Sequence, residues 1–248
     1  SDIKKFPNSM TVEDILIQSS NIGTVKIARQ IGEEKYKNFL KKLNLLNSPT
    51  FELDEIGSPI PFNWNKCKLE TISFGHGITT TPLQAATAYA SLINGGKLII
   101  PTLEKDKNKN VRFESIISEE TSKEIKSILR KVVTDEKGTA SLANVYGYEV
   151  SGKTGTSQYY DDENKNINTF ISSFVASNKN YILLVMLDDP QVAKNLTYDY
   201  RGLKIKGTRN EAGWNAVYSS GKIIEKIGPI LAINNKEVLT HHVVEKTN

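Results

Sequence analysis

The segment Gly147–Thr156, GYEVSGKTGT, matches two motifs with different chemistry. Gly152, Lys153 and Thr154 end the pattern G-x-x-x-x-G-K-[ST], in which backbone N–H groups and the lysine hold the phosphates of a nucleotide. The overlapping triplet Lys153-Thr154-Gly155 is the K-T-G found in enzymes with an active-site serine. The neighbouring elements must decide between an NTPase and an acyltransferase, because each motif requires a different local fold.

A phosphate-binding loop requires a buried strand before it and a helix after it, since the helix N-terminus contacts the phosphates. Residues 141–146 do not form a convincing buried strand, and residues 156–166 are polar and acidic. An apolar run is followed by Asp188, as a Walker-B strand would be. However, the short link at residues 178–180 permits an antiparallel hairpin and excludes the parallel crossover of such NTPases. The phosphate-binding interpretation is therefore disfavoured.

The K-T-G interpretation places Lys153 inside an edge strand, from which its ammonium points across a cleft. Gly155 then leaves room for a peptide backbone beside the strand, and Thr156 offers a hydroxyl and a backbone N–H. Upstream, the triplet SSN at Ser19–Asn21 matches S-x-N. On its own this triplet would indicate only a turn at a helix end, because Ser and Asn favour such positions. S-x-N followed by K-T-G, in contrast, is a motif pair of penicillin-binding proteins and β-lactamases.

The composition is that of an ordinary globular chain and favours chemistry without a cofactor. The 248 residues are 38% hydrophobic and 24% charged, with a net charge of +4 spread along the chain, which does not favour a nucleic-acid partner. The single cysteine, Cys67, excludes an internal disulfide and is interpreted as a structural thiol. Three histidines, two of them in the polar tail, leave little for a metal cluster or a His-based triad. No apolar run reaches the roughly eighteen residues of a membrane span.

The N-terminal half has the pattern of helices. Thr11 begins a capping box before a short helix that ends near Gln18, and the segment SSNIG interrupts the pattern. A second helix ends at Gly32, and apolar residues at i, i+3, i+4 and i+7 over Tyr36–Leu43 predict a third.

Residues 47–70 are predicted to form a loop. An alanine-rich helix follows, with Thr81 as its cap and a glycine pair as its stop. Residues 101–113 have the composition of a mixed-charge turn, after which Ser118 opens a further helix.

The period changes in the C-terminal half, where residues 148–158, 169–177 and 180–189 are predicted to form three strands. A terminal helix follows that is expected to be disturbed or to end near Pro229. The predicted fold class is α+β, with an antiparallel sheet flanked by helices.

The chain resembles the transpeptidase domain of class B penicillin-binding proteins, most closely the septal, FtsI-like branch. The resemblance covers nearly the whole chain, and four segments follow the family's order: SMTVEDILIQSSNIGTVKIA, FGHGITTTPLQAATAYASLINGG, GTASLANVYGYEVSGKTGTSQ and LLVMLDDPQ. It implies the fold shared with serine β-lactamases, with residues 1–248 as the C-terminal portion of a single domain. Two segments depart from the family: Asn215–Val217 replaces Ala-Ala-Pro, and TYDYRGLKIKGTRNEAGW replaces a shorter glycine-rich link.

The serine that the family acylates belongs to an S-x-x-K motif, which precedes S-x-N by several tens of residues. Two formal matches occur, Ser1–Lys4 and Ser219–Lys222. The first precedes a proline that stops a helix and lies too near Ser19, and the second follows K-T-G in the terminal helix. We therefore expect the chain to begin after the motif and to lack its nucleophile.

The resemblance implies that the intact protein is a D,D-transpeptidase that cross-links peptidoglycan stem peptides ending in D-Ala-D-Ala. Ser19 would relay a proton towards the leaving nitrogen, and Asn21 would hold a substrate amide. Lys153, with the hydroxyls of Thr154 and Thr156, would attract the terminal carboxylate of the substrate and polarise Ser19. The backbone N–H of Thr156 would supply half of the oxyanion hole. β-Lactam antibiotics would enter the same site as substrate mimics.

The resemblance further implies a location at the periplasmic face of the bacterial inner membrane, with an N-terminal anchor outside this chain and the septal cell-wall synthesis machinery as partner. An elongation-type penicillin-binding protein, a D,D-carboxypeptidase or a serine β-lactamase would share the motifs, although the segment TPLQAATAYASLINGG favours a transpeptidase. A non-catalytic fragment is a further interpretation of the chain itself. No cofactor is expected, and His76 is interpreted as structural.

Overall fold

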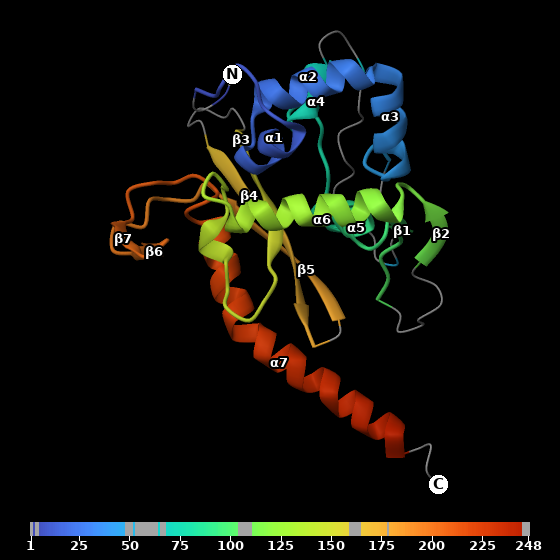
Figure 1. The fold of residues 1–248 in the computed structure, drawn as a ribbon, viewed down its shortest axis with the longest axis vertical. Helices are drawn as coiled ribbons and strands as arrows, with labels where there is room; N and C mark the ends of the chain where they lie inside the picture. Colours follow the sequence, from blue (N-terminus) through green and yellow to red (C-terminus); the bar gives the residue numbers. More distant parts are fainter. Residues whose placement is uncertain are drawn as a thin grey trace. The chain divides into compact units, whose positions relative to one another are not determined.

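A computed structural model describes residues 2, 5–47, 52, 64, 68–103, 111–158, 165–177 and 179–244 of the protein (Figure 1). The chain divides into two compact units, Ser1–Ile128 and Leu129–Asn248. Helices dominate the first unit, and the second holds a three-stranded sheet and a 29-residue helix. Among the described residues, none of the helices combines the length and the apolar character that crossing a membrane requires.

Three consecutive helices open the first unit: α1 (Val12–Gln18), α2 (Asn21–Ile31) and α3 (Glu33–Lys42). The Thr11 side chain accepts a hydrogen bond from the backbone N–H of Asp14, which confirms the predicted cap of α1. Only Gly32 separates α2 from α3, and its φ of +83° is one that glycine adopts readily. The three helices agree with the sequence pattern, except that α2 already begins at Asn21, inside the segment expected to interrupt it.

The first unit continues with α4 (Lys68–Ser73), α5 (Pro82–Ile93) and a hairpin of β1 (Lys97–Ile99) and β2 (Val111–Ser115). The predicted cap of α5 is confirmed, because Thr81 and Gln84 exchange two hydrogen bonds of 2.9 and 3.2 Å between side chain and backbone. Two expectations were wrong. Residues 68–70 were predicted to be loop but belong to α4, and residues 111–113 were predicted to be part of a turn but belong to β2. Both elements are short and depend on partners elsewhere in the unit, which local sequence patterns do not record. The rest of the predicted loop and turn lies largely outside the described residues.

Helix α6 (Glu119–Thr134) contains the boundary between the two units. Its predicted start is confirmed by the Ser118 hydroxyl, which accepts a hydrogen bond of 3.1 Å from the backbone N–H of Thr121. Within the second unit, a guanidinium nitrogen of Arg130 donates to the carbonyl oxygen of Val150 at 2.6 Å. This bond fixes the chain immediately before the sheet begins.

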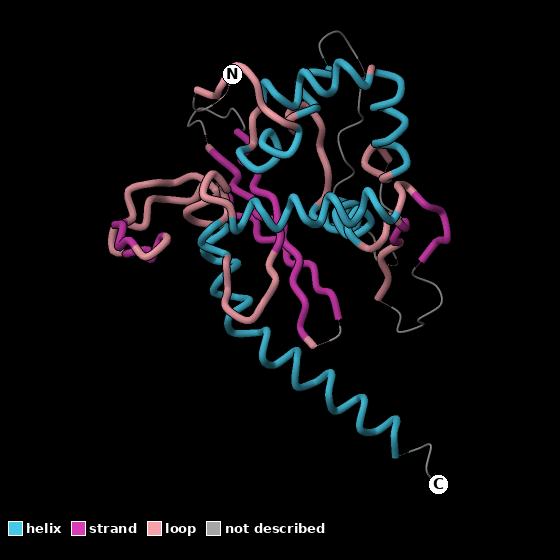
Figure 2. The backbone as a smooth tube through the Cα atoms, in the orientation of Figure 1, coloured by secondary structure: helices cyan, strands magenta, loops and turns pink. Residues whose placement is uncertain are grey.

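The second unit contains a sheet ordered β3-β4-β5, with strands β3 (Ser151–Gln158), β4 (Asn166–Ala176) and β5 (Lys179–Asp188) (Figure 2). Both pairings are antiparallel, and β3 lies at an edge of this sheet as the structure describes it. The first strand begins at Ser151, three residues later than expected. The antiparallel hairpin and the α+β fold class predicted from the sequence are both confirmed.

Helix α7 (Ala216–Val244) packs against β4 and β5 and supplies one side of the core of the second unit. Phe170, Phe174, Val217 and Ile224 are almost completely removed from water. Burial of such side chains is the main favourable contribution to folding. The core therefore holds β4 rigidly, and β3 is paired along its full length with β4.

The terminal helix was expected to be disturbed or to end near Pro229, and the second of these alternatives was wrong, because α7 continues through this residue to Val244. Proline removes one backbone donor from a helix but does not end it where tertiary packing fixes the backbone. Gly228 lies against the ring of Tyr148, so closely that a Cβ atom at position 228 would overlap with it. We attribute the continuity of α7 to this packing.

The longer of the two segments that depart from the family pattern begins with a further hairpin, β6 (Thr197–Tyr200) and β7 (Leu203–Lys206). Its two-residue turn has positive φ at both positions, 54° at Arg201 and 80° at Gly202. Edge-to-face packing of Tyr198 on Trp214, with ring centroids 5.4 Å apart, anchors it to the chain before α7. The sequence analysis did not predict these two strands.

Candidate active site

The K-T-G motif lies in the middle of β3, opposite β4. Lys153 is paired with Ile171, Thr154 with Phe170, and Gly155 with Thr169. Because side chains alternate along a strand, the Lys153 side chain leaves one face of the sheet and the Thr154 side chain leaves the other. The prediction that the lysine occupies the interior of an edge strand agrees with the sheet in the part of the chain that the structure describes.

The same strand excludes the phosphate-binding interpretation. Gly152, Lys153 and Thr154 are all extended residues of β3, whereas a phosphate-binding loop would end in a helix at this point. A Cβ atom at position 152 would come within 2.6 Å of the Phe170 ring, so this glycine is required for packing inside the sheet.

Lys153 is partly buried, and its ammonium donates a hydrogen bond of 3.0 Å to the carbonyl oxygen of Thr154. Burial lowers the pKa of the Lys153 ammonium from 10.5 to about 8, because a charged group is less stable away from water. The side chain therefore carries a positive charge at neutral pH and loses it in mildly alkaline solution. Such a group can bind an anionic substrate, and binding would stabilise its charged form.

The Thr154 hydroxyl forms a hydrogen bond of 2.9 Å with the hydroxyl of Thr139. Thr139 belongs to a tightly packed turn: a Cβ atom on neighbouring Gly138 would overlap with the Val132 carbonyl, and one on Gly213 would lie 2.7 Å from the Thr139 carbonyl oxygen. The turn therefore fixes the position of the Thr154 hydroxyl. Thr139 was not among the predicted site residues, although it directly follows Gly138, the glycine after α6, in the sequence.

Gly155 was expected to make room for a peptide backbone, and the sheet gives a second reason for this glycine. A Cβ atom at position 155 would lie 2.6 Å from Oγ1 of Thr169 on the neighbouring strand. The same hydroxyl donates a hydrogen bond of 3.3 Å to the Gly155 carbonyl oxygen. Any side chain at position 155 must therefore displace the Thr169 side chain.

We expect Gly155→Ala to reduce the free energy of unfolding by about 1–3 kcal/mol, the usual cost of an overpacked site. Thr169→Ala removes the hydroxyl in question, so the double variant should lose less stability than the two single variants added together. Chemical denaturation of all four proteins measures this coupling. Strict additivity would show that Thr169 is not the reason for the glycine.

The S-x-N triplet occupies the joint between α1 and α2. Ser19 is the residue after α1 and has the left-handed conformation, with φ of 58°. Ser20 is buried and caps α2, because its hydroxyl accepts a hydrogen bond of 3.0 Å from the backbone N–H of Gly23. Asn21 is the first residue of α2. The triplet is thus a turn at a helix end, as the simpler interpretation required, and it is also the rigid start of a new helix.

The candidate residues fall into two groups. Ser19 and Asn21 lie in the first unit, and Lys153–Thr156 lie in the second. The predicted chemistry requires the two groups to act on one substrate, which is a proposal developed below.

The formal S-x-x-K match in the terminal helix has an ordinary structural role. The Lys222 ammonium donates a hydrogen bond of 2.8 Å to Glu225 on the exposed side of α7. Ser220 is buried, and Gly221 packs against the carbonyl of Leu142. The other match, Ser1–Lys4, lies outside the described residues except for Asp2.

Histidine and cysteine side chains are further residue types that could take part in catalysis or bind a metal ion. His76 is exposed and stacks on Phe74 with ring centroids 6.4 Å apart, and its structural role stays a prediction. Cys67 lies outside the described residues. Among the described residues, no three His, Cys, Asp or Glu side chains are grouped so that they could hold a metal ion.

The sequence matches the family model of the penicillin binding protein transpeptidase domain over residues 1–208. The chain therefore belongs to this family, as its motifs predicted.

Individual relatives specify the likeness further. The chain is 31% identical over 244 residues to the probable peptidoglycan D,D-transpeptidase FtsI of Caulobacter vibrioides, which covers 93% of this chain and 40% of that protein. It is 31% identical over 199 residues to the stage V sporulation protein D of Bacillus subtilis, covering 73% of this chain and 30% of that protein. The chain thus spans less than half the length of these relatives.

Solved structures share the fold. The transpeptidase domain of Burkholderia pseudomallei penicillin-binding protein 3 superimposes with a TM-score of 0.71 at 23% identity, covering 89% of this chain and 65% of that one. Penicillin-binding protein 3 of Mycobacterium tuberculosis in complex with aztreonam gives 0.67 at 22% identity, covering 91% and 52%. The predicted penicillin-binding protein fold is confirmed.

Proposed function

We propose that the intact protein is a peptidoglycan D,D-transpeptidase that cross-links stem peptides during cell-wall synthesis. The observation that carries the proposal is Lys153, a partly buried residue of an edge strand with a lowered pKa, inside the K-T-G of a chain that belongs to the transpeptidase family. In this proposal the two compact units are parts of one transpeptidase domain. The domain is completed by a segment that carries S-x-x-K.

The proposed reaction is an acyl transfer in two steps. The serine of S-x-x-K attacks the carbonyl carbon of the penultimate D-Ala, and an ester bond to the serine forms while the C–N bond to the terminal D-Ala breaks. The leaving nitrogen takes a proton. The amine of a second stem peptide then attacks the ester carbonyl, the serine leaves and regains a proton, and a new peptide bond joins the two stems. No oxidation or reduction occurs.

The charged and polar side chains of the two motifs have complementary roles in this scheme. The Lys153 ammonium attracts the C-terminal carboxylate of the substrate and polarises Ser19, which relays a proton to the leaving nitrogen. Asn21 forms a hydrogen bond with a substrate amide. The backbone N–H of Thr156 stabilises the oxyanion together with an N–H of the nucleophilic serine.

The remaining K-T-G residues bind the substrate. In this proposal the substrate lies along the edge of β3 away from β4, which is open in the described part of the sheet and where Gly155 leaves room for an extended peptide backbone. Thr154 and Thr156 leave the opposite face of the strand from Lys153, and their hydroxyls bind the substrate carboxylate at this edge. The Thr139 hydroxyl, 2.9 Å from that of Thr154, restricts the rotation of the latter. A restricted hydroxyl loses less entropy when it binds the carboxylate.

β-Lactam antibiotics act in this proposal as mimics of D-Ala-D-Ala and acylate the same serine. The likeness to the FtsI of Caulobacter vibrioides favours a septal role, with the cell-wall synthesis machinery of the septum as partner. Cross-linking of peptidoglycan places the domain at the periplasmic face of the inner membrane, where its substrate lies. An N-terminal anchor would supply the membrane attachment.

Incubation of the full-length protein with two synthetic stem peptides, one a donor ending in D-Ala-D-Ala and one an acceptor amine, tests the proposal. We expect release of one D-Ala for each cross-linked dimer, and inhibition of both by penicillin. Release of D-Ala by hydrolysis alone would identify a carboxypeptidase instead, and rapid turnover of penicillin would identify a β-lactamase. A full-length protein that neither forms a penicillin adduct nor hydrolyses penicillin would contradict all three.

A further inference from the structure

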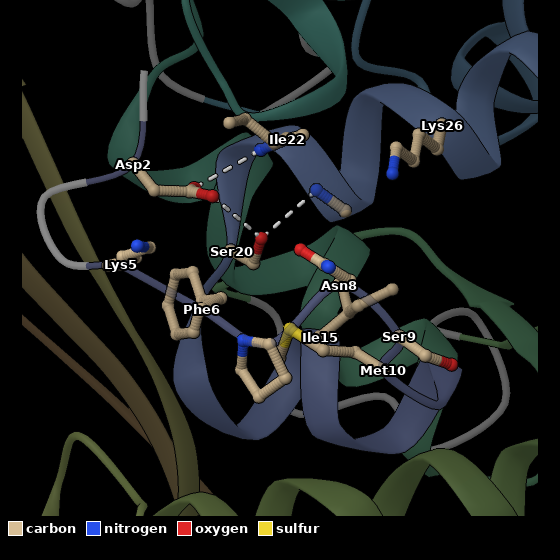
Figure 3. Close-up of a pocket in the computed structure, with 12 residues that line it drawn as sticks. Asp2, Lys5, Phe6, Asn8, Ser9, Met10, Ile15, Ser20, Ile22 and Lys26 are labelled. Atoms are coloured by element: carbon tan, nitrogen blue, oxygen red, sulfur yellow. Dashed lines mark hydrogen bonds between the residues drawn. The ribbon is translucent and has the colours of Figure 1, made fainter.

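A carboxylate from the N-terminal segment is bound at the S-x-N triplet. One oxygen of Asp2 accepts hydrogen bonds from the backbone N–H groups of Asn21, at 2.5 Å, and Ile22, at 3.1 Å. The other oxygen accepts a hydrogen bond of 3.1 Å from the hydroxyl of Ser20. Figure 3 shows the Asp2 side chain directed at Ser20 and Ile22 across one end of a pocket of about 720 Å³.

These bonds complete the cap of α2. A helix leaves its first backbone N–H groups without partners inside the helix. Asp2 binds the N–H groups of Asn21 and Ile22, and the Ser20 hydroxyl binds that of Gly23 while it donates its own proton to Asp2. The negative charge also lies where the helix dipole favours it.

The position of this cap matters because it lies at the joint that carries the two motif side chains. Ser19 has a left-handed backbone conformation, which residues other than glycine adopt only where surrounding contacts hold them. Asn21 follows two residues later at the first position of α2. Asp2 binds the backbone N–H of Asn21 directly. It also binds the side chain of Ser20, the residue between Ser19 and Asn21.

We propose that Asp2 is a positioning residue for the transpeptidase reaction, which fixes the backbone of the S-x-N triplet so that the Ser19 and Asn21 side chains keep their reactive orientation. Asp2 contacts no substrate in this proposal and acts only through Ser20 and the start of α2. The inference rests on the proposed function, since it assigns a task to Ser19 and Asn21. It adds a residue outside the three motifs to the machinery of the site.

The test compares full-length variants Asp2→Ala and Asp2→Glu with Asp14→Ala as a matched control. Asp14 is also an aspartate at a helix start, where it accepts a hydrogen bond of 2.9 Å from the Thr11 hydroxyl, and it belongs to the first turn of α1 whereas Ser19 follows the last. Stopped-flow labelling with a fluorescent penicillin gives the acylation rate constant, and the labelled amplitude gives the fraction of folded, active molecules. Thermal melting reports the stability of each variant.

We expect Asp2→Ala to lower the acylation rate constant of the active molecules roughly 10- to 100-fold, the scale on which small misplacement of reacting groups acts. Penicillin affinity before acylation should change far less. Asp2→Glu should recover part of the rate, and Asp14→Ala should lower the melting temperature but keep the rate constant within about twofold of the wild type.

A purely structural role gives a different result: Asp2→Ala would lower the melting temperature and the labelled amplitude while leaving the rate constant unchanged, and this overturns the inference. If Asp2→Ala does not fold, Asp2→Asn replaces it, because it keeps the size of the side chain. It removes the negative charge and turns one acceptor into a donor facing Ser20, so about a fivefold loss of rate is expected from the weakened cap. An unchanged rate in this variant overturns the inference as well. A wild-type protein that is not acylated at all would instead contradict the proposed function.

Discussion

Lys153→Ala in the full-length protein will lower the acylation rate constant for penicillin roughly 100- to 1,000-fold, the scale of removing one electrostatic contact to the reacting group. The substitution removes the only charge of the K-T-G motif, which in our proposal binds the substrate carboxylate and polarises Ser19. The sheet itself should survive, because the Lys153 side chain leaves the strand while the buried side chains of β4 fill the core. Rapid labelling with a fluorescent penicillin, together with a thermal melt of the same samples, measures both quantities.

The pH dependence of the acylation rate constant distinguishes an electrostatic role of Lys153 from a steric one. Since the pKa of Lys153 is lowered to about 8, the acylation rate constant at low substrate should fall as the pH rises through that value. The free energy of unfolding should change in the opposite direction. Lys153 loses its proton near pH 8 in the folded protein but keeps it up to about pH 10.5 in the unfolded chain, so the free energy of unfolding rises between about pH 8 and 10.5. Lys153→Arg, which stays charged, should be slower than the wild type but lack the alkaline limb. An acylation rate that stays constant to pH 10 in the wild type would contradict the assigned charge.

The features that were predictable from the sequence are those encoded by local patterns. The caps at Thr11 and Thr81 follow from side chains that bind a backbone N–H three residues later. The hairpin of β4 and β5 follows from the length of its link, and the strand that holds Lys153 follows from the change of period after residue 147. These inferences need no knowledge of distant residues.

The features that were missed depend on contacts between distant parts of the chain. Helix α7 continues through Pro229 because Gly228 packs on Tyr148, which lies far away in the sequence. The Thr139–Thr154 bond joins a turn to a strand, and the bonds of Asp2 to the S-x-N triplet span 18 to 20 residues. Neither contact leaves a periodic pattern in the sequence. Acyl-transfer chemistry did not suggest Thr139 or Asp2, because in our proposal these residues position the motif residues and do not react themselves.

A polypeptide of these 248 residues alone should form no covalent adduct with penicillin, which is the largest effect we expect. Acylation requires a serine whose hydroxyl is deprotonated by a nearby base. In α7, the lysine of the Ser219–Lys222 match is held by Glu225 at 2.8 Å and points towards solvent, so it cannot activate that serine. Ser19, the serine of S-x-N, has a relay role in the proposed reaction and is not its nucleophile.

The measurement is fluorescent penicillin labelling of the 248-residue polypeptide beside the full-length protein, followed by peptide mapping of any labelled band. The full-length protein should label with one penicillin per molecule at a serine outside these residues. Circular dichroism of the shorter chain serves as the control, because an unfolded polypeptide would fail to label for a trivial reason. A folded 248-residue chain that labels stoichiometrically at Ser219 or Ser19 would show that the nucleophile lies within the chain, and the assignment of the nucleophile to an S-x-x-K serine outside these residues would have to be replaced.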